Sequence, residues 1–594
     1  MCGIAGFIDK KNKLSKYKKC SIAKEMIKSI NHRGKDGAGF FCDGPIALVH
    51  ARLSILDLSK KADQPYHSEK KDIALTYNGE IYNYQKINKQ LQNNFIFRSS
   101  GDTETLLRSY QSWGMNMLSR FKGMWAFGIY DKPKKLLRLA VDRFGIKPLY
   151  YIDTDDYFAF SSEIKAFFCL SNFEPKLEKK NLGEYYIYRS IASNQTLFKE
   201  VKKMLPGTLL DYDIRNKKAK IKQYYKIKKI TLSKNNSNIK KELVKRINCS
   251  IKEHLVSDAP IGLQLSGGLD SSLIASLAVK IKKNNFHSFS IGIKRPGWNE
   301  FKYSRLVAKK LKTIHHEIYF TEEDFCSRLP KLTYQMDEPI NHLHSVPMNI
   351  LSECARKHVK VLLSGEGADE LFFGYTRYKK LFGNGLSDKK IIQSSQFVDK
   401  KIVKKITNID TELINLFRKK VVKNINNPYD KLFKLDTLTY LLPLLIRQDK
   451  MGMAANIENR VPFLDHEIAE FAYSVPLKNK LSKNNAKIIL KESAKDFLPV
   501  SIINRKKVGF GLPQSDWLRH KNGLGAYLEF FMNPEFQKRD FLNYPAVKKI
   551  INDHLEKKSD HGQILWILIA LEIWLQIFID NKDYSNIWKE VKNI

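Results

Sequence analysis

The pattern that organises the sequence is a short alternation of apolar residues leading into a turn rich in glycine and serine. Ile261, Leu263 and Leu265 are apolar at alternate positions, which predicts a strand that enters a core. The turn at 266–272 follows, and the apolar run at 273–278 predicts a helix. Such a turn leaves backbone N–H groups free at the positive end of the helix dipole. The pattern therefore predicts a site for phosphate or pyrophosphate.

The turn also contains an acidic residue, Asp270. A carboxylate cannot bind an anion directly, so we interpret Asp270 as a Mg²⁺ ligand beside the phosphates. Glycine would let the backbone approach the anion, and serine hydroxyls would add donors. The candidate anion-binding residues are Ser266, Gly267, Gly268, Ser271 and Ser272. The alternative is an ordinary strand-to-helix turn with no ligand.

The complete string Ser-Gly-Gly-Leu-Asp-Ser-Ser resembles the pyrophosphate loop of the ATP pyrophosphatase family. Members of that family cleave ATP to AMP and pyrophosphate while they activate a carbonyl group. The string differs from the GxxxxGK[ST] loop of kinases and GTPases because no lysine follows the glycines. The resemblance implies that the second half of the chain adenylates its substrate.

Strand-like and helix-like segments alternate after this turn. Residues 287–293 and 316–320 predict strands, with a helix between them at 303–311. This alternation predicts a doubly wound parallel sheet, with the ligand at the carboxyl ends of its strands. His315 and His316 are adjacent on a strand and must point to opposite faces, so we do not expect them to bind a metal as a pair.

A second turn, after the apolar segment at 361–363, is acidic. Glu366, Asp369 and Glu370 place three carboxylates within five residues, and they would repel one another unless a cation lay among them. Mg²⁺ bound to ATP is the natural candidate, with Asp369 and Asp270 as its ligands. The alternative is an acidic turn at a helix N-terminus with no ligand.

The chain begins Met1-Cys2-Gly3. Removal of the initiator methionine would expose Cys2, which would then carry a thiol and an α-amine on one residue. The amine, with an ordinary pKa of about 7.7–8, can accept the thiol proton and act as general base. The alternative is that Cys2 is only an early strand residue.

Further motifs accompany Cys2, and together they resemble class II glutamine amidotransferase domains, which have an N-terminal-nucleophile αββα fold. The motifs occur in order as His32-Arg-Gly-Lys-Asp36, Ala51-Arg-Leu-Ser-Ile55, Tyr77-Asn-Gly-Glu-Ile-Tyr-Asn83, Ser100-Gly-Asp-Thr-Glu104, 124–131, 142–150 and Leu205-Pro-Gly-Thr208. The family usually has proline where this chain has Lys35, which leaves the conformation of that loop open.

The resemblance to amidotransferases implies roles for several residues. Cys2 would attack the side-chain amide of glutamine, and Asn78 with the Gly79 amide would form the oxyanion hole. Arg52 would pair with the glutamine α-carboxylate. Asp102, together with Glu80, would hold the ammonium group. Surface salt bridges are the alternative for Arg52, Glu80 and Asp102.

The second half contains Val361-Leu-Leu-Ser-Gly-Glu-Gly-Ala-Asp-Glu370, Asp449-Lys-Met-Gly-Met-Ala454 and Glu458-Asn-Arg-Val-Pro-Phe-Leu-Asp465. These segments resemble asparagine synthetases, and the resemblance implies further roles. Glu366 would help to form an acyl-adenylate, and Lys507 would offset charge on the α-phosphate and the leaving group. Contacts with the nucleotide would come from Leu265, Ile291, Ser364 and Gly365.

Length and composition are consistent with this organisation. A chain of 594 residues is longer than a single hydrophobic core usually accommodates, so we expect more than one domain. We expect an amidotransferase domain at 1–212, a connection at 213–240 and a synthetase domain at 241–594. The seven cysteines are scattered singly, with no CxxC pair, which fits a reducing cytosol and argues against a zinc site. The apolar run at 564–579 is interrupted by Glu572 and Gln576, so we expect a buried helix and no membrane span.

The formal charge of +40 invites a nucleic-acid interpretation, but the lysines are spread along the chain without a nucleic-acid motif, so we expect solvated surface. We expect the Lys-rich segment 379–434 to be largely helical and assign it no chemistry. The sequence does not set the oligomeric state; a homodimer is one alternative.

The leading hypothesis is a cytoplasmic, glutamine-hydrolysing ligase of the asparagine synthetase kind, which uses ATP and Mg²⁺ and acts on glutamine and aspartate. Free ammonia would be protonated in bulk water, so a shielded passage should join its two sites. The acceptor stays open, because Gly452 stands where these enzymes carry serine and 340–345 departs from their pattern. A sugar carboxylate in surface-polysaccharide assembly is the alternative acceptor. A tRNA-modifying pyrophosphatase and a non-catalytic scaffold are alternatives of other classes.

Overall fold

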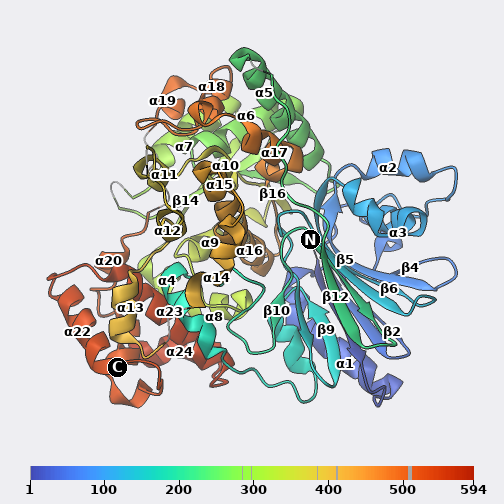
Figure 1. Ribbon diagram of the computed structural model, residues 1–594, viewed down its shortest axis with the longest axis horizontal. Coiled ribbons are helices and arrows are strands. Elements are labelled where there is room, and N and C mark those ends of the chain that lie inside the picture. Colours follow the sequence, from blue (N-terminus) through green and yellow to red (C-terminus); the bar gives the residue numbers. More distant parts are fainter. Residues whose placement is uncertain are drawn as a thin grey trace.

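The computed structural model describes residues 2–233, 235–283, 285–295, 298–383, 385–409, 413–505 and 511–593. Its first half contains two antiparallel sheets, drawn in blue to green on the right of Figure 1. One has the order β10-β8-β9-β1-β3-β2 and the other β12-β11-β7-β6-β5-β4. Their strands are β1 Gly3–Asp9, β2 Gly37–Asp43, β3 Ile46–Arg52, β4 Tyr66–His67, β5 Ile73–Ile81, β6 Gly123–Asp131, β7 Leu136–Val141, β8 Tyr150–Asp153, β9 Tyr157–Ser161, β10 Lys202–Lys203, β11 Thr208–Asp213 and β12 Lys218–Gln223.

The two sheets pack face to face between helices, and strand β1 illustrates why. Ile4 and Ile8 face the second sheet in one apolar core, while Phe7 faces helix α1 in another. Both faces of β1 are buried, which explains its nearly continuous apolar sequence. The helices of this half are α1 Lys16–Ile30 on the first sheet, α2 Tyr84–Leu91 and α3 Asp102–Trp113 on the second, and α4 Leu182–Tyr188. The predicted αββα arrangement is confirmed.

The second half is built on a five-stranded parallel sheet of order β15-β14-β13-β16-β17. Its strands are β13 Ile261–Gln264, β14 His287–Gly292, β15 Ile314–Tyr319, β16 Val361–Leu363 and β17 Glu458–Arg460. The chain adds strands outward from β13 to β15 and then returns to the other side with β16. The order therefore reverses between β13 and β16, the place where such sheets bind ligands. The predicted doubly wound sheet is confirmed.

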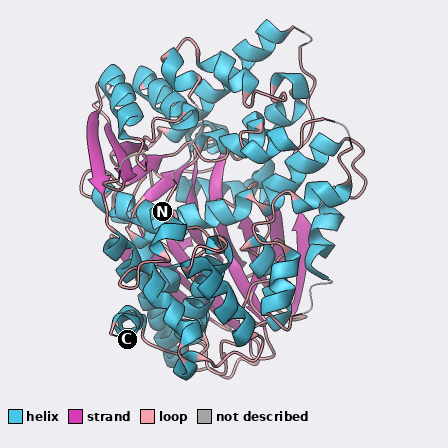
Figure 2. Cartoon of the chain, turned by 90° about the vertical axis from the view of Figure 1, so that its left-hand side faces the viewer, coloured by secondary structure: helices cyan, strands magenta, loops and turns pink. Residues whose placement is uncertain are grey.

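Helices surround the sheet of the second half. Figure 2 shows the helices and strands of the whole chain. Helices α6 and α7 share an apolar core with one face of the parallel sheet, and α9 packs against the other. The helices are α5 Asn236–His254, α6 Leu269–Ile281, α7 Phe301–Leu311, α8 Glu322–Met336, α9 Ser345–Ala355, α10 Ala368–Phe372, α11 Thr376–Lys380, α12 Asp388–Gln393, α13 Lys400–Ile406, α14 Leu416–Val422, α15 Pro428–Thr439, α16 Leu441–Ala454, α17 His466–Ser474, α18 Ile488–Ala494, α19 Val500–Ile503, α20 Gln514–Trp517, α21 Glu529–Met532, α22 Tyr544–Leu555, α23 Gly562–Phe578 and α24 Tyr584–Lys592.

Several segments can be compared with their sequence patterns. The apolar run at 564–579 forms the buried helix α23, as expected, and Trp574 Nε1 donates to the Asp337 carbonyl at 2.8 Å. No helix in the described parts of the chain combines the length and apolar character needed to cross a bilayer. The range 213–240, expected to be a connection, contains the exposed edge strand β12 and the start of α5. Its Lys-rich pattern is that of an edge strand that faces solvent.

Buried charges join the two halves. Arg33 donates to Glu163 at 3.0 Å and to Asp449 of α16 at 2.7 Å, and its side chain is fully buried. Asp337, which ends α8, accepts from Lys165 of the first half at 2.8 Å and from Lys450 of α16 at 2.7 Å. Burial alone would lower the pKa of Arg33, but the two carboxylates raise that pKa above its ordinary value. The halves are therefore held in one arrangement by paired ions from both.

We expect Arg33→Gln to destabilise the chain by about 3–5 kcal/mol, because it leaves two buried carboxylates without their cation. Urea unfolding followed by tryptophan fluorescence measures this loss. The matched control is Arg305→Gln, which breaks the ion pair between Arg305 and Glu317. The Arg305 side chain is 61% exposed, so this change should lower the free energy of unfolding by no more than about 1 kcal/mol. Equal shifts in the two variants would contradict the importance of the buried network.

Candidate active sites

The first candidate site surrounds Cys2, at the start of β1. The Cys2 backbone N–H donates to Asn78 Oδ1 at 3.0 Å, and Arg33 Nε donates to the Cys2 carbonyl at 3.1 Å. The thiol is buried, with its Sγ 3.9 Å from the Leu53 carbonyl oxygen. Burial raises the pKa of the Cys2 thiol, while nearby positive charge, including that of Arg52, opposes the shift. Contacts of its backbone N–H, its carbonyl and its thiol therefore fix the position of Cys2.

Asn78 and Gly79 lie together on β5, beside Cys2. Because Asn78 Oδ1 is used by Cys2, its amide Nδ2 is the remaining donor, and this buried atom has no partner among the described residues. A Cβ on Gly79 would lie 2.2 Å from the Met124 carbonyl oxygen and 2.7 Å from Trp125 Cα, so only glycine fits there. The structure thus brings a thiol and an unused amide donor together.

Arg52 and Asp102 are buried near this site and held by their own partners. Arg52 Nη1 donates to Asp63 and to the Ser59 carbonyl, each at 2.7 Å. Asp102 accepts from the Tyr77 hydroxyl and from the Ile81 N–H, each at 2.7 Å. Burial raises the pKa of Asp102 to about 6. The role of Tyr77 in orienting Asp102 was not foreseen, although Tyr77 lies in a motif noted in the sequence.

Glu80 faces the second half of the chain. Its carboxylate lies 3.6 Å from Arg460 Nη2, and burial, followed by the charge of Glu458, raises its pKa well above the ordinary value. Arg460 also pairs with Glu458 at 2.5 Å. Glu80 therefore lies between the glutaminase-like residues and the synthetase-like half.

The second candidate site lies at the reversal of strand order, where the turns after β13 and β16 meet. A Cβ on Gly365 would lie only 2.8 Å from the Ser271 backbone nitrogen, so the turns are in direct contact. Gly267 has a φ of +70°, and a Cβ there would lie 2.5 Å from the Ser304 nitrogen. Glycine is thus required in both turns.

Hydroxyl groups line the first of these turns. Ser266 Oγ lies 3.0 Å from Ser271 Oγ and accepts from the Gly268 N–H at 3.2 Å. Ser272, by contrast, is fully buried within α6, away from the surface of the turn. Leu265 is also buried, and its N–H donates to the Phe289 carbonyl at 2.9 Å, whereas Ile291 lies on β14. Ser364 Oγ accepts from the Glu366 N–H at 3.3 Å.

The structure brings the two predicted metal ligands together around a lysine. Lys487 Nζ lies 2.6 Å from Asp270 Oδ2 and 2.6 Å from Asp369 Oδ1. Burial alone would lower the pKa of Lys487, but the two carboxylates raise that pKa above its ordinary value. The sequence pattern gave no signal for Lys487, which precedes α18 and lies more than a hundred residues from both acids. Carboxylate oxygens suit Mg²⁺, so the acids fit an ion that shares or replaces the ammonium group.

Glu366 lies beside a group of cationic and imidazole side chains that the sequence did not identify as one site. Its carboxylate is 3.4 Å from Arg447 of α16. Arg189, at the end of α4, donates to His342 at 3.3 Å and lies over the Phe397 ring, and no carboxylate pairs with it among the described residues. Burial and then the charge of Arg189 lower the pKa of His342 well below its usual range. Lys507 lies outside the described residues.

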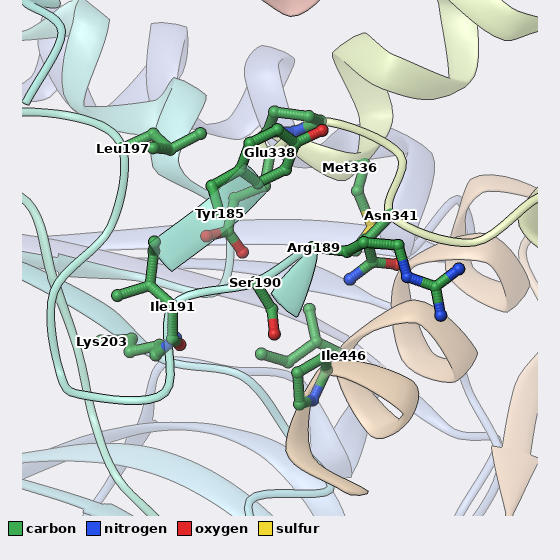
Figure 3. A pocket seen from close by; sticks show the side chains of 12 residues that line it. Tyr185, Arg189, Ser190, Ile191, Leu197, Lys203, Met336, Glu338, Asn341 and Ile446 are labelled. Atoms are coloured by element: carbon green, nitrogen blue, oxygen red, sulfur yellow. The ribbon is translucent and has the colours of Figure 1, made fainter. Parts of the chain in front are cut away.

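Arg189 also lines a small cavity between the halves (Figure 3). The cavity measures about 20 Å³, room for one or two water molecules. Its polar lining comes from both halves and includes Arg189, Ser190, Lys203, Glu338 and Asn341. The cavity therefore suits a small polar group, and its lining includes both the Arg189 guanidinium and the Glu338 carboxylate.

Comparisons with known proteins match both halves. The model of the asparagine synthase family matches residues 242–576, and that of the glutamine amidotransferase domain matches residues 1–225. The chain is 30% identical over 626 aligned positions to the Bacillus subtilis protein named asparagine synthetase [glutamine-hydrolyzing] 1, with 98% of each chain covered. It is 28% identical to the Escherichia coli protein named asparagine synthetase B [glutamine-hydrolyzing], covering 86% of this chain and 82% of the other. A solved allosteric regulatory enzyme of purine biosynthesis is 18% identical, with a TM-score of 0.29 over 50% of this chain and 66% of its own, too weak a likeness to support an argument.

We expect Lys487→Met to create a demand for a divalent cation, because Asp270 and Asp369 would face each other without the ammonium group. The variant should melt at a lower temperature than the unmodified chain. Millimolar Mg²⁺ should then raise its melting temperature more than that of the unmodified chain. The added Asp270→Asn change should abolish this rescue, and an equal Mg²⁺ effect in all three proteins would contradict a shared cation position.

Proposed function

The chain belongs to the asparagine synthase family, whose members are ATP-dependent carbon–nitrogen ligases with glutamine as amide donor, and we propose that it makes asparagine from aspartate. Glutamine would be hydrolysed at Cys2, and aspartate would be adenylated at the turns after β13 and β16. Ammonia would then displace AMP. The observation that carries the proposal is the pairing of a buried thiol and an unused amide donor with an acidic, glycine-rich nucleotide site in one chain.

The glutaminase step needs a nucleophile, a base and an oxyanion hole. Removal of Met1 would turn the Cys2 nitrogen, now 3.0 Å from Asn78 Oδ1, into the free amine that accepts the thiol proton. The thiolate would attack the glutamine amide to form a thioester, and the transferred proton would leave with ammonia. The unpartnered Asn78 Nδ2 and the Gly79 N–H would stabilise the oxyanion, each by about 3–4 kcal/mol. Water would then release glutamate from the thioester.

The adenylation step would use the second site. The aspartate β-carboxylate would attack the α-phosphate of ATP, and pyrophosphate would leave along the turn at 266–272. The N–H groups at the start of α6 favour the negative charge of that leaving group. Lys487 would orient the phosphates, while Mg²⁺ held by Asp270 and Asp369 would neutralise charge on them. Lys507 keeps its expected role at the α-phosphate.

The acceptor is aspartate in this proposal, because a relative that aligns with 98% of the chain is named an asparagine synthetase. Arg447, which lies 3.4 Å from the Glu366 carboxylate, offers positive charge for the carboxylates of aspartate. The glycine at 452 is explained by packing, since a Cβ there would lie 2.2 Å from Asn459 Nδ2. Asn459 occupies the space that a serine would need, so Gly452 reflects packing and gives no support to a larger acceptor.

Cys2→Ala tests the separation of the two reactions. The variant should lose glutamine-dependent asparagine synthesis by at least about a thousandfold, because the nucleophile is gone. It should keep ammonia-dependent synthesis with release of AMP and pyrophosphate. Chromatography of asparagine and AMP measures both, and Cys249→Ala, at an exposed cysteine, is the matched control. Formation of ADP, or amidation of a uronic acid in preference to aspartate, would overturn the proposed reaction.

Asp102 should give glutamine binding a pH dependence. Its pKa of about 6 means that the carboxylate is charged above pH 6 and neutral below it. If it holds the glutamine ammonium group, KM for glutamine should rise as the pH falls through about 6. Asp102→Asn should raise KM about tenfold to a hundredfold at pH 7.5, the worth of a charged hydrogen bond.

The same variant should lose the step in KM near pH 6 and keep ammonia-dependent synthesis. Initial glutaminase rates between pH 5 and 8 measure the effect, which spans the pKa of about 6. A pH step that persists in Asp102→Asn would assign the titration to another group.

A further inference from the structure

Three histidines gather near the edge of the parallel sheet where its strands begin, opposite the nucleotide turns. His287 starts β14, His316 lies in β15, and His358 follows α9 and precedes β16. One potential ligand atom from each ring lies within 4.8 Å of those of the other two. His287 Nδ1 is 2.8 Å from His316 Nε2, and the three ring centroids are 4.4–5.1 Å apart.

The sheet explains why these rings meet. In the parallel pairing of β14 and β15, His316 lies opposite Phe289, and His287 precedes Phe289 by two residues on the same face. Helix α9 packs on this face and brings His358 to it. His315 points to the other face, where it bonds Ser288 and Ser290, as expected for the neighbour of His316.

The histidines cover the end of a small apolar core. The residues of this core are Phe289, Leu351, Ala355, Val359, Leu362 and Ile457. The Phe289 ring lies against His316 with centroids 4.8 Å apart. Two of the imidazoles are half-buried, and His358 is exposed, which leaves a path from solvent to the cluster.

The donor set determines which ligand would bind. Three imidazole nitrogens suit Zn²⁺, Cu²⁺ or Ni²⁺, whereas Mg²⁺ and Ca²⁺ prefer oxygen. Two nitrogens bound to one Zn²⁺ at about 2.0–2.1 Å can be at most about 4.2 Å apart. The ligand atoms lie within 4.8 Å of one another and two of them share a hydrogen bond at 2.8 Å, so the rings would turn for all three nitrogens to reach one ion. A fourth position would remain for water.

We propose that His287, His316 and His358 bind a divalent transition-metal ion, with Zn²⁺ as the expected ion. The ion ties β14 and β15 to the segment between α9 and β16 and closes the small apolar core. Its role is structural, because the cluster lies at the opposite edge of the sheet from the nucleotide turns. It requires no cysteine, so it is compatible with the scattered cysteines of this chain.

Zn²⁺ binding to the full-length, tag-free chain tests this site, after the protein has been stripped with a chelator and dialysed. We expect one Zn²⁺ per chain by elemental analysis and a rise of several degrees in melting temperature, because the ion binds the folded state. His316→Gln and His358→Gln should each weaken binding at least tenfold and lose the thermal shift. His520→Gln, at an exposed histidine outside the cluster, should change neither.

Two measures keep the test decisive. The titrations are repeated in Cys2→Ala, because cysteine thiolates in general bind Zn²⁺, and the Zn²⁺ site should persist in this variant. His358 is exposed, so His358→Gln should keep the fold, with ammonia-dependent synthesis and metal-free melting temperature as checks. Zn²⁺ binding that is unchanged in His316→Gln and His358→Gln, or absent at micromolar Zn²⁺, would overturn the proposal and leave a hydrogen-bonded histidine cluster only.

Discussion

The arrangement of the molecule depends on charges that are almost completely buried between its two halves. Removing an ion from water costs several kcal/mol, and only close partners with good geometry offset that cost. Asp337 illustrates the requirement, since it accepts from the Ile164 N–H at 3.0 Å as well as from two lysines. Any other docking of the halves would leave such ions unpaired. The network therefore selects one relative position, even where its net contribution to stability is small.

Helix α16 extends this constraint to both candidate sites. Asp449 pairs with Arg33, which in turn donates to the carbonyl of Cys2. Two residues earlier on the same helix, Arg447 meets Glu366 beside the nucleotide turns. A rigid helix thus fixes the position of one site relative to the other, and the charged pairs anchor it at both. This connection is physical and continuous, so a shift of α16 would reach both sites.

The sequence was most informative where chemistry is local. The turns at 266–272 and 364–370 could be predicted because strand, glycines and acid follow one another within a few residues, and the sheet order then brings the turns together. Lys487 could not be predicted in the same way, because its two partners lie in distant segments and an isolated lysine is common in this chain. The histidine cluster is hidden for the same reason: its rings come from three separate segments. Contacts between distant segments are not encoded in a local sequence pattern, so Lys487 and the histidine cluster could not be predicted whereas the two turns could.

The electrostatics of the nucleotide site favour a divalent cation as part of the substrate. The chain as a whole has a formal charge of +40, yet the two nucleotide turns contain Asp270, Glu366, Asp369 and Glu370. Burial, followed by the charges of Asp369 and Glu366, raises the pKa of Glu370 to about 8, so Glu370 is largely neutral at pH 7. A polyphosphate would still meet carboxylates, and like charges this close repel strongly. We infer that the phosphates enter with Mg²⁺, because Lys487 offsets only one of the two charges of Asp270 and Asp369.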